Sequence, residues 1–139
     1  MRILHALPLA IVCLVGCGGP SLAGKWDTKA AGAPPGSKAV TEFTGSTFTM
    51  GLDMGQGDQS LHIDFSGDYT FDGKKLKMVG KKVVVDDSKI PAQFKSQVKA
   101  IQPMLEQQLL KTEEGDLKLE GDVATFNNGK TTTTFTKIK

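Results

Sequence analysis

Residues 61–78 read LHIDFSGDYTFDGKKLKM and hold the clearest structural pattern in the chain. Apolar and polar side chains alternate over 61–65 and again over 69–71, which is the period of a β-strand with one buried face. Asp72-Gly73 follows, and this dipeptide favours a tight hairpin turn. The alternation resumes over 76–78, so we predict two antiparallel strands joined at this turn.

Similar short β patterns, separated by turn residues, occupy most of the chain after residue 21. Glycine and proline mark a loop at 30–37, and three glycines with two acidic residues predict a mobile loop at 51–60. About eight to ten short strands joined by tight turns predict a mostly β, antiparallel fold, and closure into a barrel or half-barrel would remove its exposed edges. The other strands are expected at 22–29, 40–44, 47–52, 83–85, 116–120, 123–126 and 130–138, with turns at 45–46 and 128–129.

Residues 88–111 change to a helical pattern and predict one amphipathic helical insert. Asp87 or Ser88 is expected to cap the helix, Pro91 to lie in its first turn, and Pro103 to kink or divide it. The apolar stripe is expected to pack on its own domain as core, with a lid over a cavity or a membrane-facing surface as the alternatives. The stripe consists of Ile90, Phe94, Val98, Ile101, Leu105 and Leu109.

The first residues have the pattern of an export signal, in which the basic Arg2 precedes an apolar run. That run is too short to span a bilayer, which needs about 20 residues. The end of the run, LVGC at 14–17, resembles the lipobox of bacterial lipoproteins, with a small residue before the thiol that receives lipid. We therefore expect a cleaved signal peptide at 1–16, a lipidated Cys17 that begins a tether at 17–21, and one domain at 22–139. A plain secretory signal cut nearby is the alternative.

Composition excludes several classes of protein. Removal of residues 1–16 takes away Arg2, the only arginine, and lowers the formal net charge from +2 to +1. The lysines are scattered among acidic residues, whereas a nucleic-acid-binding surface is expected to have clustered basic residues that include arginine. Cys17 is then the only cysteine, so disulfides are excluded and the core alone must stabilise the domain.

Two short motifs resemble those of the lipocalin superfamily. Residues 22–26, LAGKW, resemble its opening Gly-x-Trp strand, and GDYTFDGKKL at 67–76 is similar to a hairpin common in small bacterial lipocalin-like domains, many of which are lipoproteins. Larger lipocalins place an arginine over the opening tryptophan. Here Lys137 or Lys139 is expected to lie over Trp26 instead, as a cation–π partner. The resemblance implies a lipocalin-like barrel that forms a ligand-holding cup for small apolar molecules.

The sequence offers little for catalysis. His62 is the only histidine after the signal, and Asp64 is its only evident partner on the predicted strand face. We therefore expect a solvent-facing histidine rather than a general base or a metal ligand. The aspartates lack the alternating pattern of a calcium loop, and the glycines of 51–57 lack the lysine and hydroxyl residue of a phosphate loop. The aspartates considered are Asp53, Asp58, Asp86 and Asp87.

Two further groups of residues have a structural and a functional interpretation. The threonines at 131–134 are expected to form the wet face of a strand rather than a ligand-binding ladder. The methionines are expected to fill gaps in a small core, with a ligand pocket as the alternative. These methionines are Met50, Met54, Met78 and Met104.

The sequence therefore predicts a lipid-anchored protein of the cell envelope that is not an enzyme and has no cofactor, metal or catalytic residues. The periplasmic face of the outer membrane is preferred over the inner membrane, because Gly18 replaces the aspartate associated with inner-membrane retention. The expected function is binding of a small apolar ligand, and a protein-interaction module with a solid core is the alternative. The expected partners are the membrane, through the lipid on Cys17, and a small hydrophobic ligand or an envelope protein, but no nucleic acid.

Overall fold

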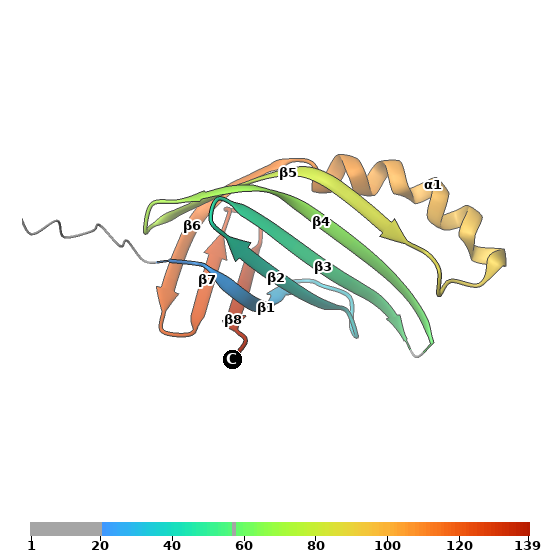
Figure 1. Cartoon of the computed structure of the whole chain (residues 1–139), viewed down its shortest axis with the longest axis horizontal. Coiled ribbons are helices and arrows are strands. Elements are labelled where there is room, and N and C mark those ends of the chain that lie inside the picture. Colours follow the sequence, from blue (N-terminus) through green and yellow to red (C-terminus); the bar gives the residue numbers. More distant parts are fainter. Residues whose placement is uncertain (1–20, 57) are drawn as a thin grey trace, which may run out of the picture.

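The computed structural model describes residues 21–56 and 58–139, which form a closed antiparallel barrel with one helix (Figure 1). Each strand pairs with the next along the chain, and β8 pairs with β1 to close the sheet. The predicted barrel is confirmed, and the half-barrel alternative is wrong. The strands are β1 (Gly24–Ala30), β2 (Lys38–Thr44), β3 (Thr47–Gln56), β4 (Gln59–Phe71), β5 (Lys75–Asp86), β6 (Thr112–Glu120), β7 (Val123–Asn127) and β8 (Thr132–Lys137); the helix α1 (Ala92–Leu109) lies between β5 and β6.

The interior of the barrel is filled by aromatic side chains at the end where β1 begins, here called the closed end. Phe43 lies at the centre, with ring centroids 4.8 Å from Tyr69 and 5.9 Å from Phe135, both in edge-to-face geometry. Aromatic pairs favour this geometry because the positive edge of one ring meets the negative face of another. The same cluster includes Leu22, Trp26, Phe48, Leu76, Met78, Leu117, Ala124 and Phe126, all buried.

Trp26 anchors the closed end of the barrel. Its indole Nε1–H donates a hydrogen bond of 2.8 Å to the carbonyl oxygen of Leu22, so the polar atom of a fully buried ring is satisfied. The ammonium group of Lys137 lies 5.5 Å from the ring centroid. The expected cation–π partner is therefore Lys137, on the strand that closes the barrel against β1.

Strands β3 and β4 continue beyond the barrel wall as one long hairpin, so the loop predicted at 51–60 is wrong. Their pairing runs without interruption to Gln56 and Gln59. Gly55, one of the glycines that indicate a loop, permits close approach of the two strands instead. Gly55 has φ 135°, and a Cβ there would lie 2.2 Å from the carbonyl oxygen of Gln59. Apolar residues at alternate positions of both strands cover one face of this extension, with those of β4 buried and those of β3 partly buried.

Strand β5 contains the segment 83–85, which was predicted as a separate strand. A bulge where Ser66 and Gly67 of β4 face β5 joins the two parts, and bulges bend a strand without ending it. Only the first part of β5 pairs with β6, over Lys75–Val79. Beyond it the barrel flares open, and α1 packs against this free part of β5 (Figure 1).

The helix is shorter than predicted and begins after Pro91 rather than at a side-chain cap. Neither Asp87 nor Ser88 caps it; a turn precedes it, in which the Ile90 N–H donates to the Asp87 carbonyl oxygen at 3.0 Å. Pro103 lies inside α1, which is not divided there. Val98 is buried, and Ile90, Leu105 and Leu109 pack with Leu61 and Ile63 of β4 as a second apolar cluster.

The predicted hairpin turns are confirmed. Gly73 has φ 99°, a conformation that glycine adopts without strain, and the carboxylate of Asp72 accepts hydrogen bonds from the backbone N–H groups of Lys74 and Lys75. Asn128 does the same for Lys130 and Thr131 at the turn between β7 and β8.

The predicted signal peptide at 1–16, Cys17 and all but Ser21 of the tether lie outside the described residues. Within 21–56 and 58–139, no helix is long and apolar enough to cross a membrane. Every strand, the helix and both apolar clusters lie within 21–139, so this segment contains all the packing described above.

Candidate functional site

The best candidate for a binding site is an apolar cup at the open end of the barrel, opposite the closed end. Its volume is about 440 Å³, within the range of about 300–1,000 Å³ typical of small-molecule sites. The strands supply inward-facing residues, and the β1–β2 loop forms one side of the rim. The lining residues are Thr28, Lys29, Ala30, Ala33, Pro34, Ser37, Ala39, Met50, Leu52, Met54 and Thr133.

Strand β3 provides the longest apolar wall of the cup. Met50, Leu52 and Met54 occupy alternate positions and therefore project from the same face of the strand. They continue the row that begins with the buried Phe48, so the cup is the unfilled upper part of the barrel interior. All four methionines are predicted to fill the core, but only Met78 does so. Met50 and Met54 line the cup, and Met104 is exposed.

A hydrogen-bonded pair of threonines lies where the cup meets the aromatic core. Thr28 Oγ1 and Thr41 Oγ1 are 2.8 Å apart, and both side chains are buried. The Thr28 hydroxyl also lies 3.3 Å from the Trp26 carbonyl oxygen, to which it donates. These hydroxyls satisfy one another, so the base of the cup presents few unmet polar groups to a ligand.

No charged group of the described lining residues points into the cup. Lys29 is on the outward face of β1, and its ammonium is 4.0 Å from Asp27 on the same outer face. Ser37 donates to the Pro34 carbonyl oxygen at 2.7 Å. The cup can therefore solvate an apolar group and offers no ion pair to a charged one.

An apolar groove lies under α1 and shares one lining residue with the cup. Its volume is about 350 Å³, and its walls are the first half of α1 and the tip of the β3–β4 hairpin. Met54 lines both the cup and the groove. On the helix side, Phe94 and Ile101 are each 41% exposed, although both belong to the predicted core stripe. The stripe is therefore core at Val98 and a groove wall at these two residues.

His62 lies on the outer face of the long hairpin, and the sequence identified only one of its two partners. Its Nδ1 is 2.6 Å from Asp53 Oδ1 and its Nε2 is 3.0 Å from Asp64 Oδ1. The sequence predicts a loop at Asp53, but this residue lies directly across from His62 in the β3–β4 pairing.

Two carboxylates facing both ring nitrogens favour the doubly protonated ring, because a carboxylate can only accept. The hydrogen bond to Asp53, assisted by Asp64, raises the pKa of His62 above its ordinary value of 6.5. The His62 side chain is 38% exposed and lines neither the cup nor the groove under α1, which suits an ion pair better than a reaction site.

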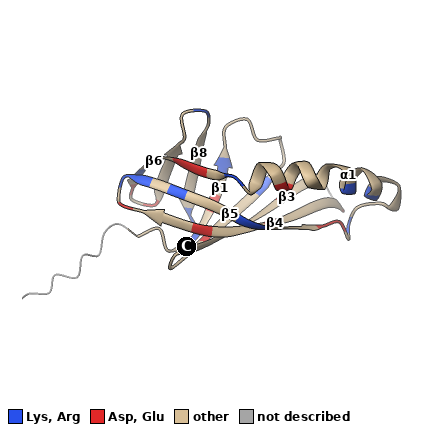
Figure 2. Ribbon diagram, turned by 90° about the horizontal axis from the view of Figure 1, so that it is seen from above, with Lys and Arg blue, Asp and Glu red and all other residues tan. Residues whose placement is uncertain are grey.

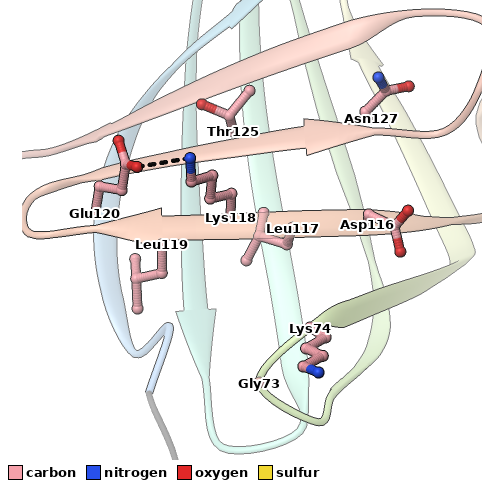
Figure 3. Close-up of a pocket in the computed structure, with 9 residues that line it drawn as sticks. All are labelled: Gly73, Lys74, Asp116, Leu117, Lys118, Leu119, Glu120, Thr125 and Asn127. Carbon is pink, nitrogen blue, oxygen red and sulfur yellow. Dashed lines mark ion pairs between the residues drawn. The ribbon is translucent and has the colours of Figure 1, made fainter.

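A larger hollow than the cup, of about 750 Å³, lies over β6 and β7 beside the β4–β5 turn (Figure 3). Lys118 and Glu120 lie across it as an exposed ion pair of 2.9 Å. Lys74, Asp116 and Asn127 in its lining are also exposed, so water competes for the polar contacts that a ligand would make with them. We therefore favour the cup as the binding site.

The remaining candidates do not assemble into a site. Asp86 accepts a hydrogen bond from the Ser88 backbone N–H, which lowers the pKa of its carboxyl group. Across 21–56 and 58–139, no cluster of three or more His, Cys, Asp and Glu side chains could hold a metal ion. Thr133 lines the cup rather than a wet strand face, whereas Thr132 and Thr134 alternate with it on the outer face. Acidic and basic residues are mixed along the strands rather than gathered in one stripe (Figure 2).

Comparison with known proteins assigns the chain to no family. No protein-family model matches the chain, and no curated protein is significantly similar to it.

Proposed function

We propose that this chain is a lipid-anchored, non-catalytic binding protein of the cell envelope that holds one small apolar ligand in its cup. The cup itself is the observation that carries the proposal. It is apolar, it has the volume of a small-molecule site, and it lies at the mouth of an eight-stranded barrel. Barrels of this size hold a single small ligand when their interior is not filled by side chains.

The anchor follows from the resemblance of 14–17 to a lipobox, with Cys17 as the lipidated residue. Residues 18–21 can span at most about 13 Å, so the domain would stand close to its membrane. Leu22 is buried at the closed end, and β1 runs from there to the rim of the cup. The cup would therefore open away from the bilayer and receive its ligand from the aqueous side.

The proposal is tested on purified residues 21–139 by native mass spectrometry and by titration with dansyl-undecanoic acid. We expect a co-purified apolar molecule or saturable binding of one probe per chain. Absence of both would refute the proposed function. The variant Ala39→Leu, which adds volume in the cup wall, should weaken binding, whereas Val84→Thr, on the exposed outer face of β5, should not.

A protein-interaction role is the second candidate, and the exposed apolar residues of α1 favour it. Met104 is 58% exposed, and Phe94 and Ile101 add apolar area on the same helix. Photo-crosslinking from position 104 in intact cells would capture one reproducible envelope protein if this role is correct. Capture of no reproducible partner would count against it.

A further inference from the structure

We propose that the ligand is a single flexible apolar chain that fills the cup with one part and the groove under α1 with its far end. This inference rests on the proposed function and adds a second subsite and a ligand class to it. It begins from the residue that the two spaces share. Met54 lines both of them, and the row Met50, Leu52, Met54 leads from one to the other along β3.

The distance along that row defines the shape of the ligand. Met50 and Met54 are four residues apart on an extended strand, which is about 13 Å. A compact molecule confined to the cup would not reach the groove, whereas an extended chain would contact both. Methionine suits this connection because its unbranched side chain adapts to the group that passes it.

The size of the groove argues against a protein segment as its occupant. An α-helix with its side chains is about 10–12 Å across and rises about 5.4 Å per turn. A groove of about 350 Å³ would enclose less than one turn of such a helix. An alkyl chain is narrow enough to lie between α1 and the hairpin tip.

The exposure of two groove residues is explained by such an occupant. Phe94 and Ile101 continue the stripe whose other members are packed, yet each is 41% exposed. A chain in the groove would cover them and would contribute the burial that the folded protein leaves incomplete. Ile90 and Val98, which also line the groove, already contact the second apolar cluster.

None of the described lining residues points a charged group into the cup, and this limits where the polar end group of the ligand can lie. Lys29 is directed outward beside Asp27. The described lining residues therefore place no positively charged group inside the cup that could pair with the carboxylate of a ligand. The polar end of the ligand must then remain in water at the rim, and affinity should depend on the length of the chain rather than on the charge of its head.

The test measures displacement of dansyl-undecanoic acid from residues 21–139 by octanol, decanol, dodecanol and tetradecanol, and by the acids of the same lengths. We expect the dissociation constant to fall about twofold to fourfold for each added methylene through the whole series. Acid and alcohol of one length should differ by less than about tenfold. The variant Ile101→Asp should bind octanol as the wild type does and tetradecanol at least about tenfold more weakly, and Met104→Asp, also exposed on α1 but outside the groove, should match the wild type.

The outcomes separate this inference from the proposed function. Affinity that stops rising at the length that fills the cup would overturn the inference and leave the cup as a binding site. Equal weakening of all lengths by Ile101→Asp, or self-association of the wild type that this variant abolishes, would also overturn it. Failure of every chain, and of the probe, to bind would refute the proposed function itself.

Discussion

Substitution of Gly80 by alanine should loosen the contact between α1 and the barrel. Gly80 is a buried residue of β5 at the point where the barrel flares and the end of α1 crosses it. A Cβ at this position would lie 2.2 Å from the Leu109 carbonyl oxygen and 2.5 Å from Cε2 of the Phe65 ring. Neither distance is tolerable for carbon, so both the helix end and the ring must move by roughly 1 Å to restore contact at about 3.5 Å.

The size of the effect follows from which atoms must move. Adding a methyl group to a packed site costs about 1–3 kcal/mol. The upper part of this range is expected here, because the nearest atom belongs to the helix backbone and not to the end of a flexible side chain. Urea unfolding of residues 21–139, followed by fluorescence of Trp26, the only tryptophan, measures this cost.

Gly51→Ala is the matched control. Gly51 is also a strand glycine without positive φ, but its Cβ would lie 3.3 Å from the His62 ring, which is partly exposed and can shift. We expect a change below about 0.5 kcal/mol there. If Gly80→Ala were as stable as Gly51→Ala, α1 would not be seated against β5 as described.

Three further predictions concern the closed end, the outer face and the cup. Trp26→Phe should lower the free energy of unfolding by about 1–3 kcal/mol, because the Leu22 carbonyl oxygen loses its hydrogen-bond donor and Lys137 loses the indole ring beneath it. Urea unfolding followed by circular dichroism measures this change, and a value below about 0.5 kcal/mol would contradict the prediction. The raised pKa of His62 means that its ion pairs stabilise the fold fully below the unfolded value of 6.5 and that this contribution is lost as pH rises through the folded pKa. His62→Gln should therefore cost about 0.2–1 kcal/mol at pH of about 5.5 and almost nothing at pH of about 9, and an equal cost at both would refute the assignment. Ala39→Leu should weaken binding of dansyl-undecanoic acid at least about tenfold while its urea midpoint stays near that of the wild type, since Ala39 lines an open space; unchanged affinity would place the probe elsewhere.

The sequence was sufficient to predict an antiparallel barrel or half-barrel, because its decisive signals are local. Alternation over 61–65 and the turn at Asp72-Gly73 depend only on neighbouring residues, and both are confirmed. The expectation that Lys137 or Lys139 lies over Trp26 rests instead on the resemblance to larger lipocalins, and the structure places Lys137 there.

The extension of the β3–β4 hairpin was missed for a physical reason. Glycines at 51, 55 and 57 indicate a loop when only local propensity is considered. In the fold, Gly55 permits close approach of the two strands, and apolar residues on one face of both strands stabilise the extension against α1. Such pairing depends on partners that local patterns do not reveal.

The candidate site could be predicted only in part. The resemblance implied a cup, but its lining depends on which residues of five different segments face inward at one end of the barrel. Helical spacing puts Phe94 and Ile101 on one stripe with Val98. Which of the three the sheet buries depends on how α1 lies against it, and only Val98 is buried. The same holds for Asp53, which reaches His62 because β3 continues past its predicted end.

Methyl NMR of the methionines tests the cup most directly. Residues 21–139 contain Met50 and Met54 in the cup, Met78 in the core and Met104 on the exposed side of α1, so each environment carries its own probe. Titration with dodecanol should shift the ε-methyl signals of Met50 and Met54 saturably and leave those of Met78 and Met104 in place. Saturable shifts at Met104 alone, or no shift at either cup methionine, would contradict the central claim that the open end of the barrel binds an apolar ligand.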